Sequence, residues 1–351
     1  MKLAAVETAF PERWYPQDQL TEQLIELLGL AGHKSRADRL RALHGNAGID
    51  GRHLILPLED YANLGGFTGA NRAWLKGAID LGERSCTSAL AAAGVRPDEV
   101  DAIFFSTVTG LASPSVDARL VQRLGLRHDV KRVPMFGLGC VAGAATVARA
   151  ADFVRNDPTA VVLALTVELC SLTLQTQDHS VANLISVGLF GDGAAAAVIV
   201  GSERDANGPA IEATRSVFYP DTEDVMGWNI GSHGFRIVLS AEVPDVARER
   251  VPQDVDAFLA AHELTRGDIA RWIAHPGGPK VLQGLQEGLQ LQREDLAISW
   301  QSLARAGNLS SASVLMILAE TLRQRPGSAN DLGVMLAMGP GFCSELLLLR
   351  W

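Results

Sequence analysis

The chain has 351 residues, 47% hydrophobic and 20% charged, a balance typical of a globular protein with roughly two domains. Its 31 Lys and Arg oppose 40 Asp and Glu, giving a net charge of −9, which argues against a nucleic-acid partner because phosphate binding needs a basic surface. No apolar run approaches the roughly 18 residues that span a bilayer, and the N-terminus shows no secretory signal, so we expect a cytoplasmic protein without integral membrane association. The cysteine spacings suit neither zinc nor disulfide frameworks, so we expect free thiols and no metal.

In chain order, residues 1–60 are predicted to be mostly irregular, with one helix over 21–31. Helix and strand patterns then alternate. The predicted elements are a helix over 78–94 and strands over 100–108, 160–167 and 194–200. The polar, turn-rich stretch 201–209 predicts a boundary between an N-terminal half of 1–205 and a C-terminal half of 206–351.

The two predicted halves repeat one another. In each, a helix leads through a short polar turn into a strand, one beginning at Asp101 and the other at Ala270, 169 residues later. An Ala-rich helix begins at Cys140, and a similar helix begins at Asn308, 168 residues later. Two motifs at nearly one offset indicate an internally duplicated α/β unit.

Cys140 is the candidate nucleophile. The glycines before it allow a sharp strand-to-helix turn, and the positive end of a helix stabilises a thiolate. The alternative is a buried structural cysteine. Cys86 and Cys343 lack this glycine setting and are expected to serve packing, whereas Cys170, just beyond a predicted strand, could face a cavity.

His275 and Asn308 are candidate partners for Cys140. His275 ends a predicted strand, and a Pro-Gly-Gly-Pro turn follows it, in the position where open α/β sheets place their sites. Asn308 occupies in the second half the place of Cys140 in the first, although an asparagine at a helix start is most often an N-cap. If the halves pack about a pseudo-twofold axis, the two helix starts converge on one pocket.

A cysteine, a histidine and an asparagine without a carboxylate or a metal suit two chemistries. One is a papain-like hydrolase, in which the asparagine orients the histidine. The other is carbon–carbon bond formation from acyl thioesters, which fits a duplicated chain better. The cysteine would carry the acyl group, while the histidine Nε2–H and the asparagine amide would donate to the enolate oxygen of a decarboxylated malonyl thioester.

Five motifs together resemble those of type III polyketide synthases, the chalcone synthase-like branch of the thiolase superfamily. They are GCVAGAA at 139–145, LFGDGAAAAVIVG at 189–201, AHPGGPKVL at 274–282, GNLSSASV at 307–314 and MGPGFCSELLLLRW at 338–351. The resemblance implies a duplicated, five-layered αβαβα thiolase fold and a homodimer with two separate active sites. It also implies Cys140 as nucleophile, His275 and Asn308 as the decarboxylation pair, and coenzyme A thioesters as substrates without a cofactor.

The resemblance assigns further positions around the catalytic residues. It implies that Phe190 is a gatekeeper between a coenzyme A tunnel and the cavity. Ile237 stands where plant members carry a second gate phenylalanine, and Phe235 lies two residues earlier on the same predicted face. The basic stretch 34–52 lies where the family binds the coenzyme A phosphates. The candidate coenzyme A contacts are Arg39, Arg52, Lys280, Gly277 and Gly278.

The chain ending and the His-Pro-Gly-Gly-Pro-Lys turn look most like bacterial enzymes that make alkylpyrones or alkylresorcinols. On this reading a fatty acyl-CoA starter is loaded on Cys140 and extended with malonyl-CoA. A tetrahydroxynaphthalene synthase, which uses malonyl units alone, shares the Cys170 region and the stretch 221–224 and is the first alternative. A single-round ketoacyl synthase of the initiating class and a catalytically silent acyl-CoA-binding scaffold are the others.

Overall fold

A computed structural model of the chain describes residues 1–324 and 327–351, and nine of its strands form one continuous sheet. In the N-terminal half the strand order is β5-β4-β6-β7-β1, in which β4 pairs in parallel with β5 and β6, and β7 runs antiparallel to β6 and β1. The bounds of these strands are β1 (Lys2–Ala9), β4 (Ala102–Thr107), β5 (Lys131–Phe136), β6 (Val161–Leu169) and β7 (Asp192–Val200).

The C-terminal half continues the sheet with the order β8-β13-β12-β11. Here β11 and β12 are parallel, and β13 is antiparallel to β12 and β8. The bounds are β8 (Ala210–Phe218), β11 (Ile269–Ala274), β12 (Leu332–Gly339) and β13 (Cys343–Arg350). One antiparallel pair, Lys2 with Ala210, joins β1 to β8 and so connects the two parts of the sheet.

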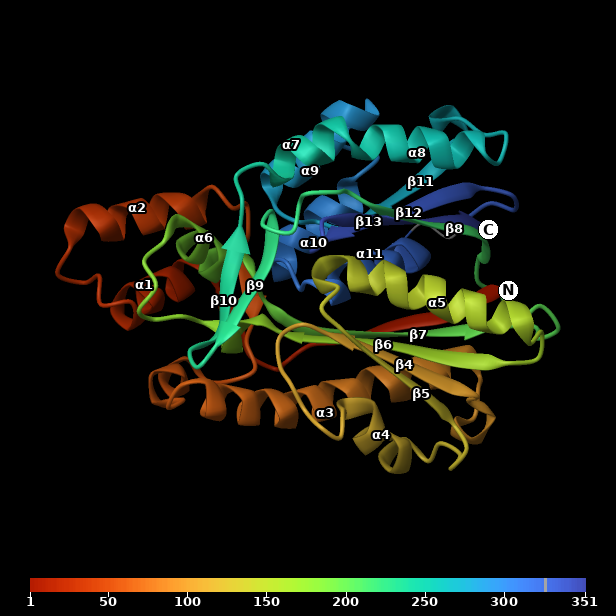
Figure 1. The fold of residues 1–351 in the computed structure, drawn as a ribbon, viewed down its shortest axis with the longest axis horizontal. Coiled ribbons are helices and arrows are strands. Elements are labelled where there is room, and N and C mark those ends of the chain that lie inside the picture. The colour runs from red at the N-terminus through yellow and green to blue at the C-terminus, as the bar shows by residue number, and fades with distance from the viewer. Residues whose placement is uncertain (325–326) are drawn as a thin grey trace.

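Helices fill the space between and outside the two parts of the sheet, which gives five layers (Figure 1). The middle layer is α5 (Ala142–Asn156) and α11 (Ser311–Gln324), whose faces are buried nearly all round because each lies between sheets. The outer layers are α3 (Phe67–Ala93) with α4 (Val116–Leu124) on one side, and α7 (Val243–Glu249), α8 (Val251–Ala260) and α9 (Pro279–Leu289) on the other. The duplicated five-layered fold expected from the sequence is therefore confirmed.

Each half repeats the same chain path. A one-turn 3₁₀ helix, η2 (Pro97–Glu99) or η5 (Arg266–Asp268), leads into β4 or β11, and the central helix α5 or α11 leads into the next parallel strand. In both 3₁₀ helices the third residue accepts from the backbone N–H of the residue before the helix, Glu99 from Arg96 at 2.9 Å and Asp268 from Thr265 at 2.7 Å. The N-termini of α5 and α11 consequently lie at equivalent places in the two halves.

The remaining elements are β2 (Trp14–Pro16), α1 (Gln17–Leu27), α2 (Lys34–Gly45), β3 (Gly51–His53), η1 (Leu58–Asn63), η3 (Gly139–Val141), η4 (Cys170–Thr173), α6 (Val181–Leu189), β9 (Met226–Gly231), β10 (Gly234–Leu239) and α10 (Ala297–Ala306). Of these, α1, α2, α6, β9 and β10 lie at the end of the molecule opposite the two chain termini (Figure 1). In the described residues, no helix combines the length and the apolar character that crossing a membrane requires.

Two expectations for the first hundred residues were wrong. The N-terminal segment is not irregular, because β1 pairs along its length with β7 near the middle of the sheet. Its sequence, KLAAVETA, contains few β-branched or aromatic residues, so tertiary pairing decides its conformation. The helix expected over 78–94 begins earlier, at Phe67, where Gly66 in a left-handed conformation precedes it.

Candidate active site

Cys140 lies in η3, the 3₁₀ turn that opens α5, and its side chain is buried. α5 approaches α11 closely at Gly143, where a Cβ atom would lie 2.1 Å from the Ser311 carbonyl oxygen. Only a glycine lets the two helix starts meet at this distance. The Cys140 Sγ lies 3.6 Å from the Ser310 Oγ, so the start of one half contacts the start of the other. The convergence expected from the repeat is therefore present.

The Asn308 side chain has a fixed orientation beside Cys140. Its Oδ1 accepts a hydrogen bond of 2.7 Å from the Ser310 N–H, which leaves Nδ2 as the donor. Nδ2 donates to the Gly277 carbonyl at 3.3 Å, and the amide also lies in hydrogen-bonding range of the Cys140 thiol, where it favours the thiolate. Asn308 thus connects Cys140 with the turn that follows His275.

His275 is buried at the end of β11, where its backbone N–H donates to the Leu336 carbonyl at 2.9 Å. Neither ring nitrogen has a hydrogen-bond partner among the described residues. Because buried polar atoms are rarely left unpaired, this imidazole is available to a bound ligand. Burial lowers the pKa of His275 to about 3, so the ring is neutral at physiological pH.

The charge state of the thiol differs from the sequence expectation. Burial raises the pKa of Cys140 to about 12, and the nearby Glu168 carboxyl adds to the increase, whereas hydrogen bonds from Ser310 and Asn308 oppose it. The stabilisation of a thiolate by the helix start is thus outweighed by loss of hydration. In the ligand-free protein both the thiol and the imidazole are neutral. Such a site can exchange thioesters only by moving the thiol proton as the carbon–sulfur bond forms.

Glu168 is a buried carboxyl group that the sequence analysis missed. It accepts hydrogen bonds from the Ser311 Oγ at 2.5 Å, the Thr109 Oγ1 at 2.9 Å and the Val108 N–H at 3.1 Å. Burial nevertheless raises its pKa to about 7. A signal was present, since Glu168 is the one charged residue in the apolar strand β6, where a buried charge requires partners.

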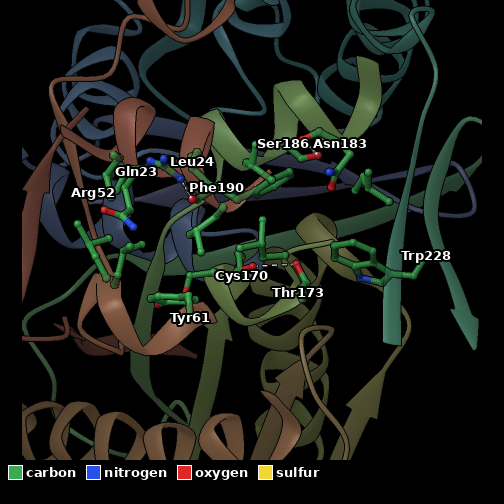
Figure 2. Close-up of a pocket in the computed structure, with 18 residues that line it drawn as sticks. Gln23, Leu24, Arg52, Tyr61, Cys170, Thr173, Asn183, Ser186, Phe190 and Trp228 are labelled. Atoms are coloured by element: carbon green, nitrogen blue, oxygen red, sulfur yellow. Dashed lines mark hydrogen bonds between the residues drawn. The ribbon is translucent and has the colours of Figure 1, made fainter. Parts of the chain in front are cut away.

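A largely apolar pocket lies beside Phe190, the residue that bridges to Asn308, and its walls do not include Cys140, His275 or Asn308 themselves (Figure 2). Phe190, Ile237 and Cys170 line it, as expected of cavity residues. Phe235 does not line this pocket, because its ring packs against those of Phe67, Phe136 and Trp228. The other lining residues come mainly from α1, η1, η4 and α6. They include Leu20, Leu24, Leu27, Leu54, Leu58, Tyr61, Thr173, Asn183, Ser186 and Trp228.

The five candidate coenzyme A contacts occupy different environments. The Arg39 and Lys280 side chains are exposed, and neither has an ion-pair partner among the described residues. Arg52 is 3% exposed and bonded to interior groups, so it lies not on the surface with Arg39 but in the wall of the pocket (Figure 2). Gly277 accepts the Asn308 amide, and Gly278 precedes the first residue of α9. No described cluster of His, Cys, Asp or Glu side chains is arranged to hold a metal ion.

Comparison with known proteins gives one consistent result. The N-terminal domain of chalcone and stilbene synthases matches residues 1–204, and their C-terminal domain matches residues 210–351. A 1,3,6,8-tetrahydroxynaphthalene synthase of Streptomyces peucetius subsp. caesius is 50% identical over 99% of this chain and 93% of its own length. A phloroglucinol synthase of Pseudomonas fluorescens is 30% identical over 97% of this chain and 98% of its own.

The crystal structure of 1,3,6,8-tetrahydroxynaphthalene synthase from Streptomyces coelicolor A3(2), a bacterial type III polyketide synthase, superposes with a TM-score of 0.95. It shares 28% identity and covers 100% of this chain and 99% of that chain. The resemblance expected from the five motifs is thus confirmed, whereas these relatives favour the tetrahydroxynaphthalene alternative over the alkylpyrone reading. The chain is a transferase that acts by decarboxylative condensation and belongs to the chalcone and stilbene synthase family of type III polyketide synthases.

Proposed function

We propose that this enzyme condenses malonyl-CoA units alone and releases 1,3,6,8-tetrahydroxynaphthalene. The observation that carries the proposal is the 50% identity, across nearly the whole chain, to a synthase of that product. The product has ten carbons, which correspond to five two-carbon units. A malonyl group that loses CO2 supplies two carbons, so five malonyl-CoA molecules account for the skeleton without another starter.

Loading begins with both catalytic partners neutral. The Cys140 sulfur attacks the carbonyl of the acyl-CoA thioester while its proton moves to His275, and coenzyme A leaves as a thiol after recovering a proton. One thioester bond forms and one breaks, so the step is nearly balanced in free energy. The burial that raises the pKa of the thiol also lowers that of the imidazole, which keeps the resting site uncharged until substrate arrives.

Extension needs a carbanion, which decarboxylation supplies. The bond between the carboxylate and the α-carbon of malonyl-CoA breaks, CO2 leaves, and the electron pair forms an enolate. His275 Nε2–H and Asn308 Nδ2–H donate to the enolate oxygen. The enolate carbon then attacks the Cys140 thioester, and the sulfur leaves. Two uncharged donors in a buried site stabilise the developing charge, whereas a carboxylate at this point would repel it.

A second candidate, an alkyl-primed synthase that releases alkylpyrones or alkylresorcinols, is favoured by the pocket walls. Five leucines from α1, η1 and the segment before η1 line the space beside Phe190 (Figure 2). These side chains would contact an alkyl starter without leaving polar groups unpaired. The pocket therefore suits an apolar chain as well as a folded aromatic product.

We also propose that the enzyme is a homodimer. Strand β5 lies at the edge of the sheet and pairs only with β4 among the described strands. Its Phe136 side chain is exposed, and so is the Leu111 side chain in the loop after β4. An unpaired strand edge with apolar side chains favours association with a second copy. Analytical ultracentrifugation is expected to give twice the mass of the chain, and a monomer across micromolar concentrations would refute the dimer.

Product analysis tests the function directly. The purified enzyme is incubated with malonyl-CoA alone and with acyl-CoA starters of increasing length, and the products are identified by mass spectrometry. We expect tetrahydroxynaphthalene, or its oxidation product, from malonyl-CoA alone and none from Cys140→Ala. Pyrones or resorcinols formed only with an acyl starter would replace the first candidate by the second. The absence of any product from a folded dimer would refute both.

A further inference from the structure

Three successive carbonyl groups at the end of α6 are held by three different parts of the chain. The Gly188 carbonyl accepts from Gln17 Nε2 at 2.6 Å, and the Leu189 carbonyl accepts from the Asn308 N–H at 2.9 Å. The Phe190 carbonyl accepts from Arg52 Nη1 at 2.5 Å. The last carbonyls of a helix have no partner within the helix, so these three contacts determine where the chain goes after α6.

Arg52 is an unusual member of this group because it is a charged side chain in the interior. Burial lowers its pKa to about 10, which still leaves the guanidinium charged at neutral pH. Among the described residues, no carboxylate oxygen lies within 4.0 Å of a nitrogen of the Arg52 guanidinium. Its hydrogen-bond partners among the described residues are the Phe190 carbonyl and the Gln17 Oε1, which accepts from Nε at 3.0 Å. A charge-assisted hydrogen bond in a buried site constrains its acceptor strongly.

The acceptor segment is continuous with Asn308. Phe190 and Asn308 form an isolated parallel bridge, and the Gly191 N–H donates to the Asn308 carbonyl at 2.9 Å. The Arg52 side chain also packs against Gly307, where a Cβ atom would lie 3.0 Å from its Cδ. Arg52 therefore contacts the backbone on both sides of the bridge that carries Asn308.

We propose that Arg52 is a positioning residue for the decarboxylation step, acting through the Phe190–Asn308 bridge and not through coenzyme A. It fixes the Phe190 carbonyl, the bridge fixes the Asn308 backbone, and the Asn308 amide is thereby aimed at the enolate oxygen. The inference rests on the decarboxylating role of Asn308 in the proposed function, but not on the identity of the final product.

The test compares Arg52→Met and Arg52→Lys with the wild-type enzyme. Methionine keeps much of the apolar length and removes every donor, whereas lysine keeps the charge and one donor to the Phe190 carbonyl. Arg266→Met is the matched control, because Arg266 also donates to backbone carbonyls, those of Gly288 and Pro252, but lies beside α8 and α9. The release of CO2 from malonyl-CoA gives kcat and KM, and iodoacetamide labelling of Cys140 reports whether the nucleophile is intact.

A positioning role predicts a selective loss. For Arg52→Met we expect kcat for decarboxylation to fall roughly 10- to 100-fold, as for a displaced oxyanion donor, with KM and the labelling rate within about threefold of wild type. Arg52→Lys should recover part of the loss, and Arg266→Met should behave as wild type. If Arg52→Met does not fold, a lower kcat at unchanged KM in Arg52→Lys supports the same conclusion.

Other outcomes would overturn the proposal. A large increase in KM at unchanged kcat would make Arg52 a coenzyme A contact. If kcat and the rate of Cys140 labelling fall together in both Arg52 variants, Arg52 has a role in folding alone. The same conclusion follows if Arg52→Met does not fold and a folded Arg52→Lys keeps the wild-type kcat. CO2 release by the wild-type enzyme is measured separately from ring formation. If the enzyme decarboxylates malonyl-CoA but makes no tetrahydroxynaphthalene, the proposed product is wrong, and the comparison of the Arg52 variants with wild type remains valid.

Discussion

Replacing Glu168 by glutamine should remove a pH-dependent loss of stability. The buried carboxyl has a pKa of about 7 in the folded protein, against an ordinary pKa of 4.5 for an exposed glutamate. Between these two values the folded state retains a proton that the unfolded state releases. The contribution of the protonated Glu168 to the free energy of unfolding is therefore at its full size below pH 4.5, and it is lost as the pH rises through 7.

The size of the effect follows from the shift. One pKa unit corresponds to about 1.4 kcal/mol, so a shift from 4.5 to about 7 is worth about 3 kcal/mol in total, of which about 2.5 kcal/mol is lost between pH 5 and pH 8. Glutamine carries no such penalty. Its amide has nearly the shape of the protonated carboxyl and can keep an acceptor toward Thr109 and Val108 while its NH2 group donates to the Ser311 hydroxyl.

The measurement is the urea unfolding midpoint of wild type and Glu168→Gln at pH 5, 6, 7 and 8. Asp192, whose pKa burial raises to about 6, and His275 titrate in both proteins, so their contributions cancel in the difference. We expect the stability of wild type relative to the variant to fall by about 2.5 kcal/mol across this range. A difference that is constant from pH 5 to pH 8 would show that Glu168 is already ionised when folded, which would refute the reasoning from burial.

Two glycine substitutions test the close contacts that assemble the site. Gly143→Ala should lower the free energy of unfolding by about 1–2 kcal/mol, because overpacking against the Ser311 carbonyl exceeds the gain in helix propensity. Product formation should fall more than tenfold as α5 and α11 separate. Unfolding and activity equal to those of wild type would contradict this prediction. Gly307→Ala places a Cβ 2.6 Å from the Leu189 carbonyl oxygen at φ +70° and ψ −163°, whereas Gly66→Ala has nearly the same backbone, φ +82° and ψ −161°, and open space. Both should lose about 1–3 kcal/mol because only glycine readily adopts this backbone, but only Gly307→Ala should lose a further 1–3 kcal/mol and CO2 release, so equal unfolding midpoints would argue against the contact.

The parts of the molecule that repeat could be predicted from the sequence. The matched offsets of Asp101 with Ala270 and of Cys140 with Asn308 correspond to β4 with β11 and to the starts of α5 and α11. A repeat is visible because both copies preserve their helix starts and buried strands. β1 was missed because a short segment of alanine, glutamate and threonine has no strong intrinsic preference and acquires its conformation from β7.

The environment of the site residues could not be predicted in the same way. Arg52 was expected to bind coenzyme A because it stands in a basic stretch, yet charge along the sequence does not distinguish an arginine on a helix surface from one on β3 facing inward. The coenzyme A contact expected of Arg52 stays a prediction, whereas the pKa of Cys140 is raised where the helix start had predicted a lowered one. A helix start is visible in a sequence, but the extent of burial is a property of the assembled layers, and here burial has the larger effect.

These two results have a common physical basis. A decarboxylating site gains from being dry, because hydrogen bonds to a developing enolate oxygen are stronger where water is excluded. Dryness makes every charge inside costly, so Cys140 and His275 rest in their neutral forms. The charge of Arg52 is stabilised by the Phe190 carbonyl, the Gln17 side chain and the field of the Asp192 carboxyl. Among the described residues, the one buried guanidinium therefore stands behind the bridge at Phe190, where its charge can orient Asn308.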